Sequence, residues 1–193
     1  KSAAAYKTIW TDEGSPLVVT SEKFGDAVKK ESPVPVEMVM RYGNPSIESG
    51  IIKLMDEVDS LEELLIIPMY PHYAESTWKT ALEEVKHQLK KHKLVPRLKV
   101  IKPFYNLDAY ITLLSNSIKP HLKKSYDHIL FSYHGLPERH LRKADPTGMV
   151  CLKQAKCCES THPNVHATCY RAQTVKMTEL IAKQLKLNTN KFS

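Results

Sequence analysis

Short apolar runs alternate with segments of helical periodicity along the chain, and this alternation constrains the fold more than any other feature. Four runs rich in apolar and β-branched residues predict buried strands. These runs span residues 34–40, 64–70, 98–104 and 128–133. Strands that alternate with helices are typical of an α/β fold with a mainly parallel sheet and helices on its faces.

Two of the intervening helices have sequence signals for their starts. Asn44 followed by Pro45 predicts an N-cap and a first turn, after which one apolar stripe is formed by Ile47, Ile51, Leu54, Met55 and Val58. Asn106 precedes a second stripe of Leu107, Tyr110, Ile111, Leu114 and Ile118. Pro120 and a lysine pair then interrupt the pattern, so we expect a first subdomain over residues 1–122 and a second over 123–193.

Composition excludes several classes of protein. With 193 residues, 42% of them hydrophobic and 25% charged, the chain is in the range of globular proteins rather than disordered ones. No apolar run approaches the roughly 20 residues of a membrane span, and the start shows no signal-peptide core. We therefore expect a cytoplasmic protein, with peripheral membrane contact left open. The two common phosphate-binding glycine motifs are absent, which argues against nucleotide chemistry.

The net charge of +7 indicates an anionic partner: nucleic acid, a membrane surface or a carboxylate-bearing small molecule. The densest basic run covers residues 86–93 and has apolar residues at helical spacing, without interleaved aromatic side chains that would stack on bases. We interpret it as the solvated face of a helix, and we expect no nucleic-acid partner.

A histidine follows the fourth predicted strand. His134 precedes Gly135 in the run F-S-Y-H-G-L-P of residues 131–137, which places its imidazole at the carboxyl end of the sheet. Ligands bind at that edge in open α/β folds, and an imidazole with a pKa near about 6.5 takes up a proton or binds a metal ion. The alternative is a structural histidine that caps a turn.

The run around His134, followed by Asp145 and Pro146, resembles the active-site signature of the ferrochelatases. Three further blocks resemble that family in order and spacing: G-S-P-L at residues 14–17, M-R-Y-G at 40–43 and P-M-Y-P-H-Y at 68–73. The resemblance runs over the whole chain but covers only the central part of the family. We therefore expect a chain truncated at both ends, without the family's opening strand and the C-terminal segment that supplies a glutamate.

The resemblance implies a chelatase-like fold of two Rossmann-like subdomains that hold a porphyrin in a cleft. It implies insertion of ferrous iron into protoporphyrin IX to form protohaem, a lyase reaction of haem biosynthesis. Coproporphyrin as the substrate is one alternative, and a non-catalytic tetrapyrrole- or metal-binding module with a structural zinc site is another. The segment alone is expected to be inactive. Nothing in the sequence indicates the oligomeric state.

The resemblance also implies roles for single residues. His134 matches the family residue that accepts protons or handles the substrate iron. The residues that match porphyrin-contacting or pocket positions of the family are Tyr6, Ser15, Arg41, Tyr42 and Tyr70. Two residues depart from the family pattern: His72 stands where the family often has glutamine, and Tyr133 where it commonly has alanine.

All four cysteines of the chain fall within residues 151–169, at Cys151, Cys157, Cys158 and Cys169. Such clustering favours a metal site over unrelated thiols or disulfides. Three cysteines joined by His162 or His166 would suit zinc, whereas four thiolates suit a [2Fe–2S] cluster, in which each iron needs two protein ligands. The segment resembles the cluster-bearing segment of some bacterial ferrochelatases, which implies a [2Fe–2S] cofactor on the four cysteines.

Overall fold

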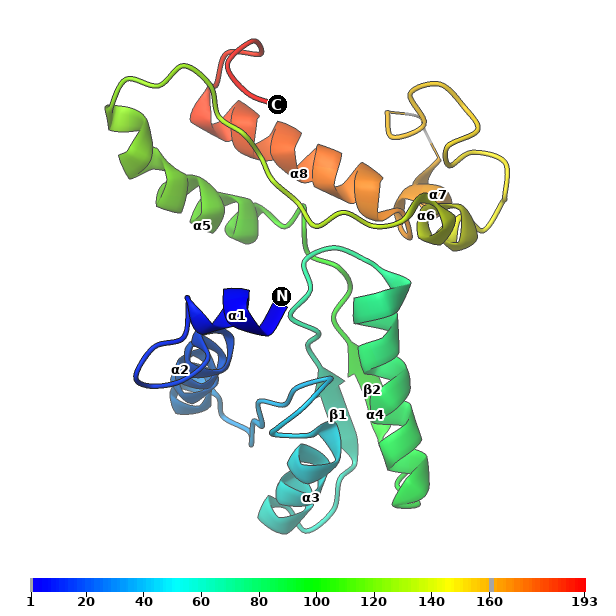
Figure 1. Cartoon of the computed structure of the whole chain (residues 1–193). Coiled ribbons are helices and arrows are strands. Elements are labelled where there is room, and N and C mark those ends of the chain that lie inside the picture. Colours follow the sequence, from blue (N-terminus) through cyan, green and yellow to red (C-terminus); the bar gives the residue numbers. More distant parts are fainter. Residues whose placement is uncertain (1, 160–161) are drawn as a thin grey trace. The chain divides into compact units, whose positions relative to one another are not determined.

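The computed structural model describes residues 2–159 and 162–193 (Figure 1). Its packing divides the chain into two compact units. The first contains the residues up to Leu64 together with Glu83–Lys99, and the second contains Leu65–Leu82 together with Val100–Ser193. The predicted subdomain boundary near residue 122 stays a prediction.

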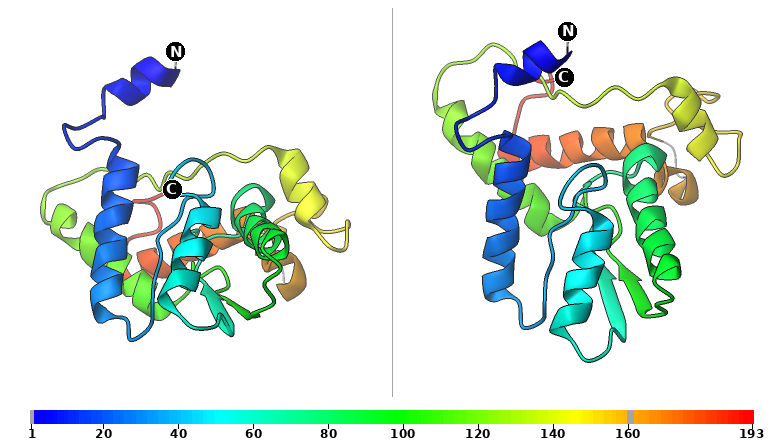
Figure 2. Two further views of the ribbon diagram at one scale, coloured as in Figure 1. Left: turned by 90° about the horizontal axis from the view of Figure 1, so that it is seen from below. Right: turned by 60° about the horizontal axis from the view of Figure 1, so that its bottom comes forward.

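Two strands of the chain form a parallel pair. Strand β1 (Glu63–Ile66) is followed by a π-helical turn η1 (Glu75–Lys79), helix α4 (Thr80–Lys91) and strand β2 (Arg97–Val100). The Arg97 N–H donates to the Glu62 carbonyl at 2.8 Å, and the Ile101 N–H donates to the Ile66 carbonyl at 2.9 Å. The two strands therefore run in the same direction. Figure 2 shows the two strands side by side. A helix that connects two parallel strands confirms the predicted α/β class.

The predicted strands are longer than the observed ones, and prolines account for much of the difference. The run over residues 34–40 forms no strand; only Met40 makes an isolated bridge, to Ser46. Pro33 and Pro35 carry no N–H and so cannot donate to a strand ladder. β1 and β2 end well before the predicted residues 70 and 104, ahead of prolines at 68 and 103.

The fourth predicted strand, residues 128–133, is extended but pairs only briefly. The Ile129 N–H donates to the Lys191 carbonyl at 2.9 Å, and the Phe131 N–H donates to the Ser193 carbonyl at 2.8 Å. This parallel bridge between Ile129 and Phe192 is too short to count as a strand. It nevertheless sets the direction in which the chain enters residues 131–137, which carry the predicted active-site histidine.

Three further helices of the first unit are α1 (Ser2–Lys7), α2 (Pro16–Glu31) and α3 (Ile47–Glu57). The prediction of Asn44 as the N-cap of α3 is wrong, because the cap is Ser46, whose Oγ accepts a hydrogen bond from the Ser49 N–H at 3.0 Å. A serine hydroxyl satisfies one of the free N–H groups of a first helical turn.

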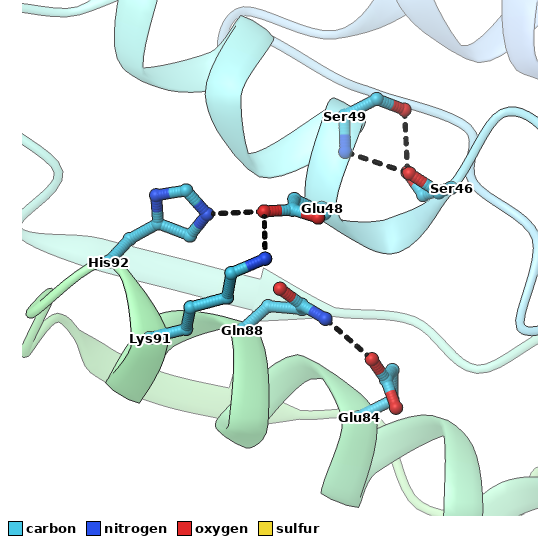
Figure 3. Close-up of polar contacts among 7 residues, drawn as sticks. All are labelled: Ser46, Glu48, Ser49, Glu84, Gln88, Lys91 and His92. Carbon is cyan, nitrogen blue, oxygen red and sulfur yellow. Dashed lines mark hydrogen bonds and ion pairs between the residues drawn. The ribbon is translucent and has the colours of Figure 1, made fainter.

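Glu48 links α3 to the end of α4 (Figure 3). Its carboxylate accepts from Lys91 Nζ at 2.7 Å and lies 2.8 Å from His92 Nε2. The hydrogen bonds from Lys91 and then His92 hold the pKa of Glu48 below its ordinary value. Along α4, Val85 and Leu89 are buried and the lysines are exposed, as the solvated-face interpretation predicts.

Replacing Gly50 by alanine should destabilise the chain. A Cβ at this buried position of α3 would collide with Val39 Cγ1. Overpacking of this kind costs about 1–3 kcal/mol, against up to about 1 kcal/mol gained from the better helix former. We expect a net loss of about 1–2 kcal/mol in the free energy of unfolding, measured with urea. The double variant with Val39→Ala should recover part of the loss, and a Gly50→Ala chain as stable as the wild type would contradict the described packing.

The second unit is mainly helical beyond residue 100. Its elements are α5 (Asp108–Ile118), the 3₁₀ helix η2 (Lys119–Lys123), α6 (Glu138–Ala144), α7 (Pro163–His166) and α8 (Tyr170–Leu185). Helices α5 and α8 lie against each other (Figure 1), with Ile111, Met177 and Ile181 buried in their shared core. Most of the stripe predicted for α5 joins this core, but Leu107 is 56% exposed, since it precedes the helix as its N-cap residue.

A second apolar cluster surrounds α6, α7 and the start of α8. It contains Leu141, Val150, Val165 and Ala172 together with three of the four cysteines. Among the described residues, the structure offers no helix with the length and apolar character needed to cross a membrane.

Candidate functional site

A cavity of about 260 Å³ in the second unit brings together two of the predicted site residues, His134 and Tyr70. Its wall comes from three segments: the loop after β1 with η1, the extended residues before α6, and the first residue of α8. The lining residues are Tyr70, Pro71, His72, Ala74, Ser76, Thr77, His134, Leu136 and Tyr170. The Pro71 carbonyl accepts from the Tyr105 N–H at 3.0 Å, which holds the first of these segments in place.

His72 is buried in a cage of aromatic rings beside this cavity. Its ring lies 6.2 Å from that of Tyr105, 5.7 Å from Tyr133 and 5.5 Å from Tyr170, measured between ring centroids. Only 8% of His72 is exposed, and within the described residues its Nε2 has no hydrogen-bond partner. Burial lowers the pKa of His72 to about 4, so its imidazole is neutral at pH 7.

Tyr170 contacts both histidines. Its ring packs edge-on against His72, and its hydroxyl is hydrogen-bonded to the backbone of His134. Burial raises the pKa of the Tyr170 hydroxyl, and the bond to the His134 backbone partly offsets that rise. Tyr170 therefore ties the two histidine-bearing segments to the start of α8.

A buried glutamine fixes the loop that carries His72. Gln173 is 1% exposed, and its Oε1 accepts from the Tyr73 N–H at 2.7 Å. Its Nε2 donates to the carbonyls of His166 and Ala167 at 2.9 and 3.0 Å. Nothing in the sequence singles out this residue, because a glutamine in a helix is ordinarily a surface residue.

The other predicted porphyrin residues belong to the first unit. The Arg41 guanidinium lies 4.5 Å from the centroid of the Tyr42 ring and 3.6 Å from a carboxylate oxygen of Glu84. Tyr6 and Tyr42 are 60% and 72% exposed, and Ser15 precedes α2 without a side-chain capping bond. Their predicted contacts with a porphyrin stay predictions.

The four cysteines gather in the cluster around α6, α7 and α8. Cys151, Cys157 and Cys169 are buried there, and Cys158 packs against them. The Sγ atoms of Cys151 and Cys169 are 3.9 Å apart. Cys169 is the N-cap of α8 and accepts from the Ala172 N–H at 3.5 Å. A hydrogen bond from Cys158, aided by backbone N–H groups, lowers the pKa of Cys169 to about 6, whereas burial and then Cys169 raise that of Cys151 to about 12.

The donor set fits the implied cluster in part. Two thiolates on one tetrahedral metal ion are about 3.8 Å apart when each metal–sulfur bond is about 2.3 Å, and the Cys151–Cys169 pair has nearly that spacing. Across residues 2–159 and 162–193, no group of three or more His, Cys, Asp or Glu side chains is arranged as a complete metal site. His162 is the N-cap residue of α7, and His166 Nε2 lies 3.0 Å from the Cys157 carbonyl.

Asp145 organises the turn that leads into the first cysteine. Oδ1 accepts from the Thr147 N–H at 2.9 Å and from its hydroxyl at 2.7 Å. Oδ2 accepts from the N–H groups of Val150 and Cys151 at 2.9 and 2.8 Å. Burial favours a higher pKa for Asp145, but these hydrogen bonds outweigh it and hold the pKa well below the ordinary value. An Asp two residues before a Thr and three before a Gly is the sequence signal of such a turn.

These features define a class: an α/β protein with two histidines on one cavity and a separate cluster that contains four cysteines. The sequence model of one family, "Ferrochelatase", matches residues 1–193. The chain belongs to the ferrochelatase family, as its sequence motifs predict.

Curated relatives agree with this membership. A protein named "Ferrochelatase" from Pseudomonas savastanoi pv. phaseolicola is 45% identical over 194 residues, covering 100% of this chain and 56% of the relative. One of the same name from Ectopseudomonas mendocina is 46% identical over 193 residues, with 100% and 56% covered. One from Azotobacter vinelandii is 42% identical over 194 residues, with 100% and 57% covered. The chain thus spans little more than half the length of these relatives.

Proposed function

We propose that the full-length protein containing this chain is a ferrochelatase: a lyase that inserts ferrous iron into protoporphyrin IX to form protohaem. The observation that supports this most is the placement of His134 and Tyr70 on one cavity, in a chain of this family. Coproporphyrin, with its extra propionates, is the alternative substrate.

The chemistry requires a base at the point where metal enters the macrocycle. Two pyrrole N–H protons must leave as iron binds, and a histidine at the cavity can accept one of them or hand the metal to the ring nitrogens. His134 is exposed in an extended segment, so its imidazole is accessible to both partners. Arg41 and the tyrosines Tyr6, Tyr42 and Tyr70, with Ser15, are proposed to bind the porphyrin, because guanidinium groups pair with propionates and aromatic rings offer an apolar face.

The test is anaerobic incubation of the full-length protein with ferrous iron and either protoporphyrin IX or coproporphyrin III. We expect the metalloporphyrin absorption bands to appear, faster with protoporphyrin IX. A faster reaction with coproporphyrin III would reassign the substrate. Porphyrin binding without insertion of iron would overturn the enzyme proposal and favour a binding module.

We further propose that Cys151, Cys157, Cys158 and Cys169 hold a [2Fe–2S] cluster. Support comes from the Cys151–Cys169 spacing and from the packing of all four cysteines into one cluster. Their thiolates would hold the two irons in pairs, and the cluster would supply a redox-active or structural centre. The cytoplasmic address and peripheral membrane contact stay predictions.

The visible spectrum and the metal content should distinguish the cluster from a structural zinc site, and a substitution tests the ligands. Protein purified without oxygen is expected to show visible bands that bleach with dithionite, with iron and sulfide in equal amounts. In Cys169→Ser these bands should be lost, because serine is a poor ligand for this iron. A colourless wild-type protein with stoichiometric zinc would contradict the proposal and assign the segment to zinc.

A further inference from the structure

In the described part of the chain, His72 has an unpaired nitrogen, and its side chain lines the cavity that the proposed catalytic histidine also lines. Its Nε2 has no hydrogen-bond partner among the described residues although the side chain is more than nine-tenths buried, and it lines the same cavity as His134. Buried polar atoms are almost always satisfied, so an unpaired one in a native structure calls for a functional explanation. A ligand that enters the cavity would supply the missing partner.

We propose that His72 and His134 together hold the incoming ferrous ion in this cavity before it reaches the porphyrin. The inference rests on the proposed function and adds a second imidazole to it. Imidazole nitrogen suits ferrous iron, and two such ligands in a roomy cavity leave coordination positions open for water and for the pyrrole nitrogens. The ion exchanges water for nitrogen ligands, and its oxidation state does not change.

The surroundings of His72 support a positioned ligand rather than a packing residue. Tyr105, Tyr133 and Tyr170 restrict its ring from three sides, which fixes the direction of the nitrogen. Rigid support of this kind is what orients metal-binding histidines. Tyr170 also contacts the backbone of His134, so one side chain holds both histidine-bearing segments in place.

The cavity is suited to transient binding. Its other polar side chains are the hydroxyls of Tyr70, Ser76, Thr77 and Tyr170, and none of the lining residues is acidic. A site of two imidazoles and hydroxyls binds a divalent ion less tightly than one with carboxylates or thiolates, because it does not compensate the ion's charge. Weak binding allows the ion to move on to the macrocycle.

Two substitutions of His72 test the proposal in the full-length protein. His72→Gln keeps a polar side chain of similar reach, and His72→Phe keeps the aromatic contacts; both remove the imidazole. We expect each to raise KM for ferrous iron about tenfold or more, with KM for the porphyrin unchanged. His121→Gln, an exposed histidine in η2, is the matched control and should change neither constant.

A second readout does not depend on activity. The protein labelled with ¹⁵N-histidine is titrated with Zn²⁺ alone as a diamagnetic stand-in for ferrous iron. We expect the side-chain nitrogen resonances of His72 and His134 to shift together along one binding curve, and His72→Gln to weaken the shift of His134. Zn²⁺ that moves His134 alone, or an unchanged KM for iron in both His72 variants of an active enzyme, would overturn the inference while leaving the proposed function intact. A wild-type protein that inserts no iron but shows the paired shifts would remove the function and keep the metal site.

Discussion

Replacing His134 by alanine in the full-length protein is expected to lower kcat for iron insertion about 100- to 10,000-fold, the range that a positioned acid–base group contributes. The fold should survive, because His134 is exposed in an extended segment and fills no part of a core. The measurement is the initial rate of metalloporphyrin formation without oxygen, together with the melting temperature by circular dichroism.

The matched control for this experiment is His121→Ala, which removes an exposed imidazole of the same unit from η2. It should retain wild-type turnover. If the His134 variant turned over at a nearly normal rate, the residue would have no part in the chemistry and the cavity would need another base. A large loss accompanied by a lowered melting temperature would instead show a structural histidine.

Removing the Asp145 carboxylate should destabilise the turn before the cysteines and prevent cluster assembly. In Asp145→Ala, four donors on Thr147, Val150 and Cys151 lose their acceptor. Hydrogen bonds to a charged group contribute more than neutral ones, so we expect a loss of about 2–4 kcal/mol in the free energy of unfolding. Iron and sulfide content should fall with it.

Asp145→Asn sharpens the same test. Its single carbonyl oxygen can still accept from Thr147, but its NH₂ group would face the N–H groups of Val150 and Cys151. Both sides are then hydrogen-bond donors, so no bond forms there. We therefore expect most of the effect of the alanine variant from this nearly isosteric change. Asp127→Asn, an exposed carboxylate of the same unit, is the control and should keep its cluster. Full iron and sulfide content in Asp145→Asn would contradict the role assigned to the carboxylate.

Local patterns in the sequence predicted much of the fold class and part of the site. Alternating apolar runs and helical stripes predicted an α/β chain, since periodicity reports which face of an element is buried. The same signal overestimated strand length, because it takes no account of prolines that end or prevent a ladder, as at Pro33 and Pro35. His134 was identifiable because it follows a strand-like run, and the cysteines because all four lie close together in sequence.

The class of fold, the family and the residue types available for chemistry can be predicted from the sequence alone. Which of those residues meet depends on the tertiary structure. His72 and Tyr133, the two departures from the family pattern, pack ring against ring, and His72 shares a cavity with His134. Gln173, on a helix far away in the sequence, holds the loop that carries His72. Contacts of this kind depend on how loops and helices far apart in the chain pack together, and local spacing carries no information about that packing.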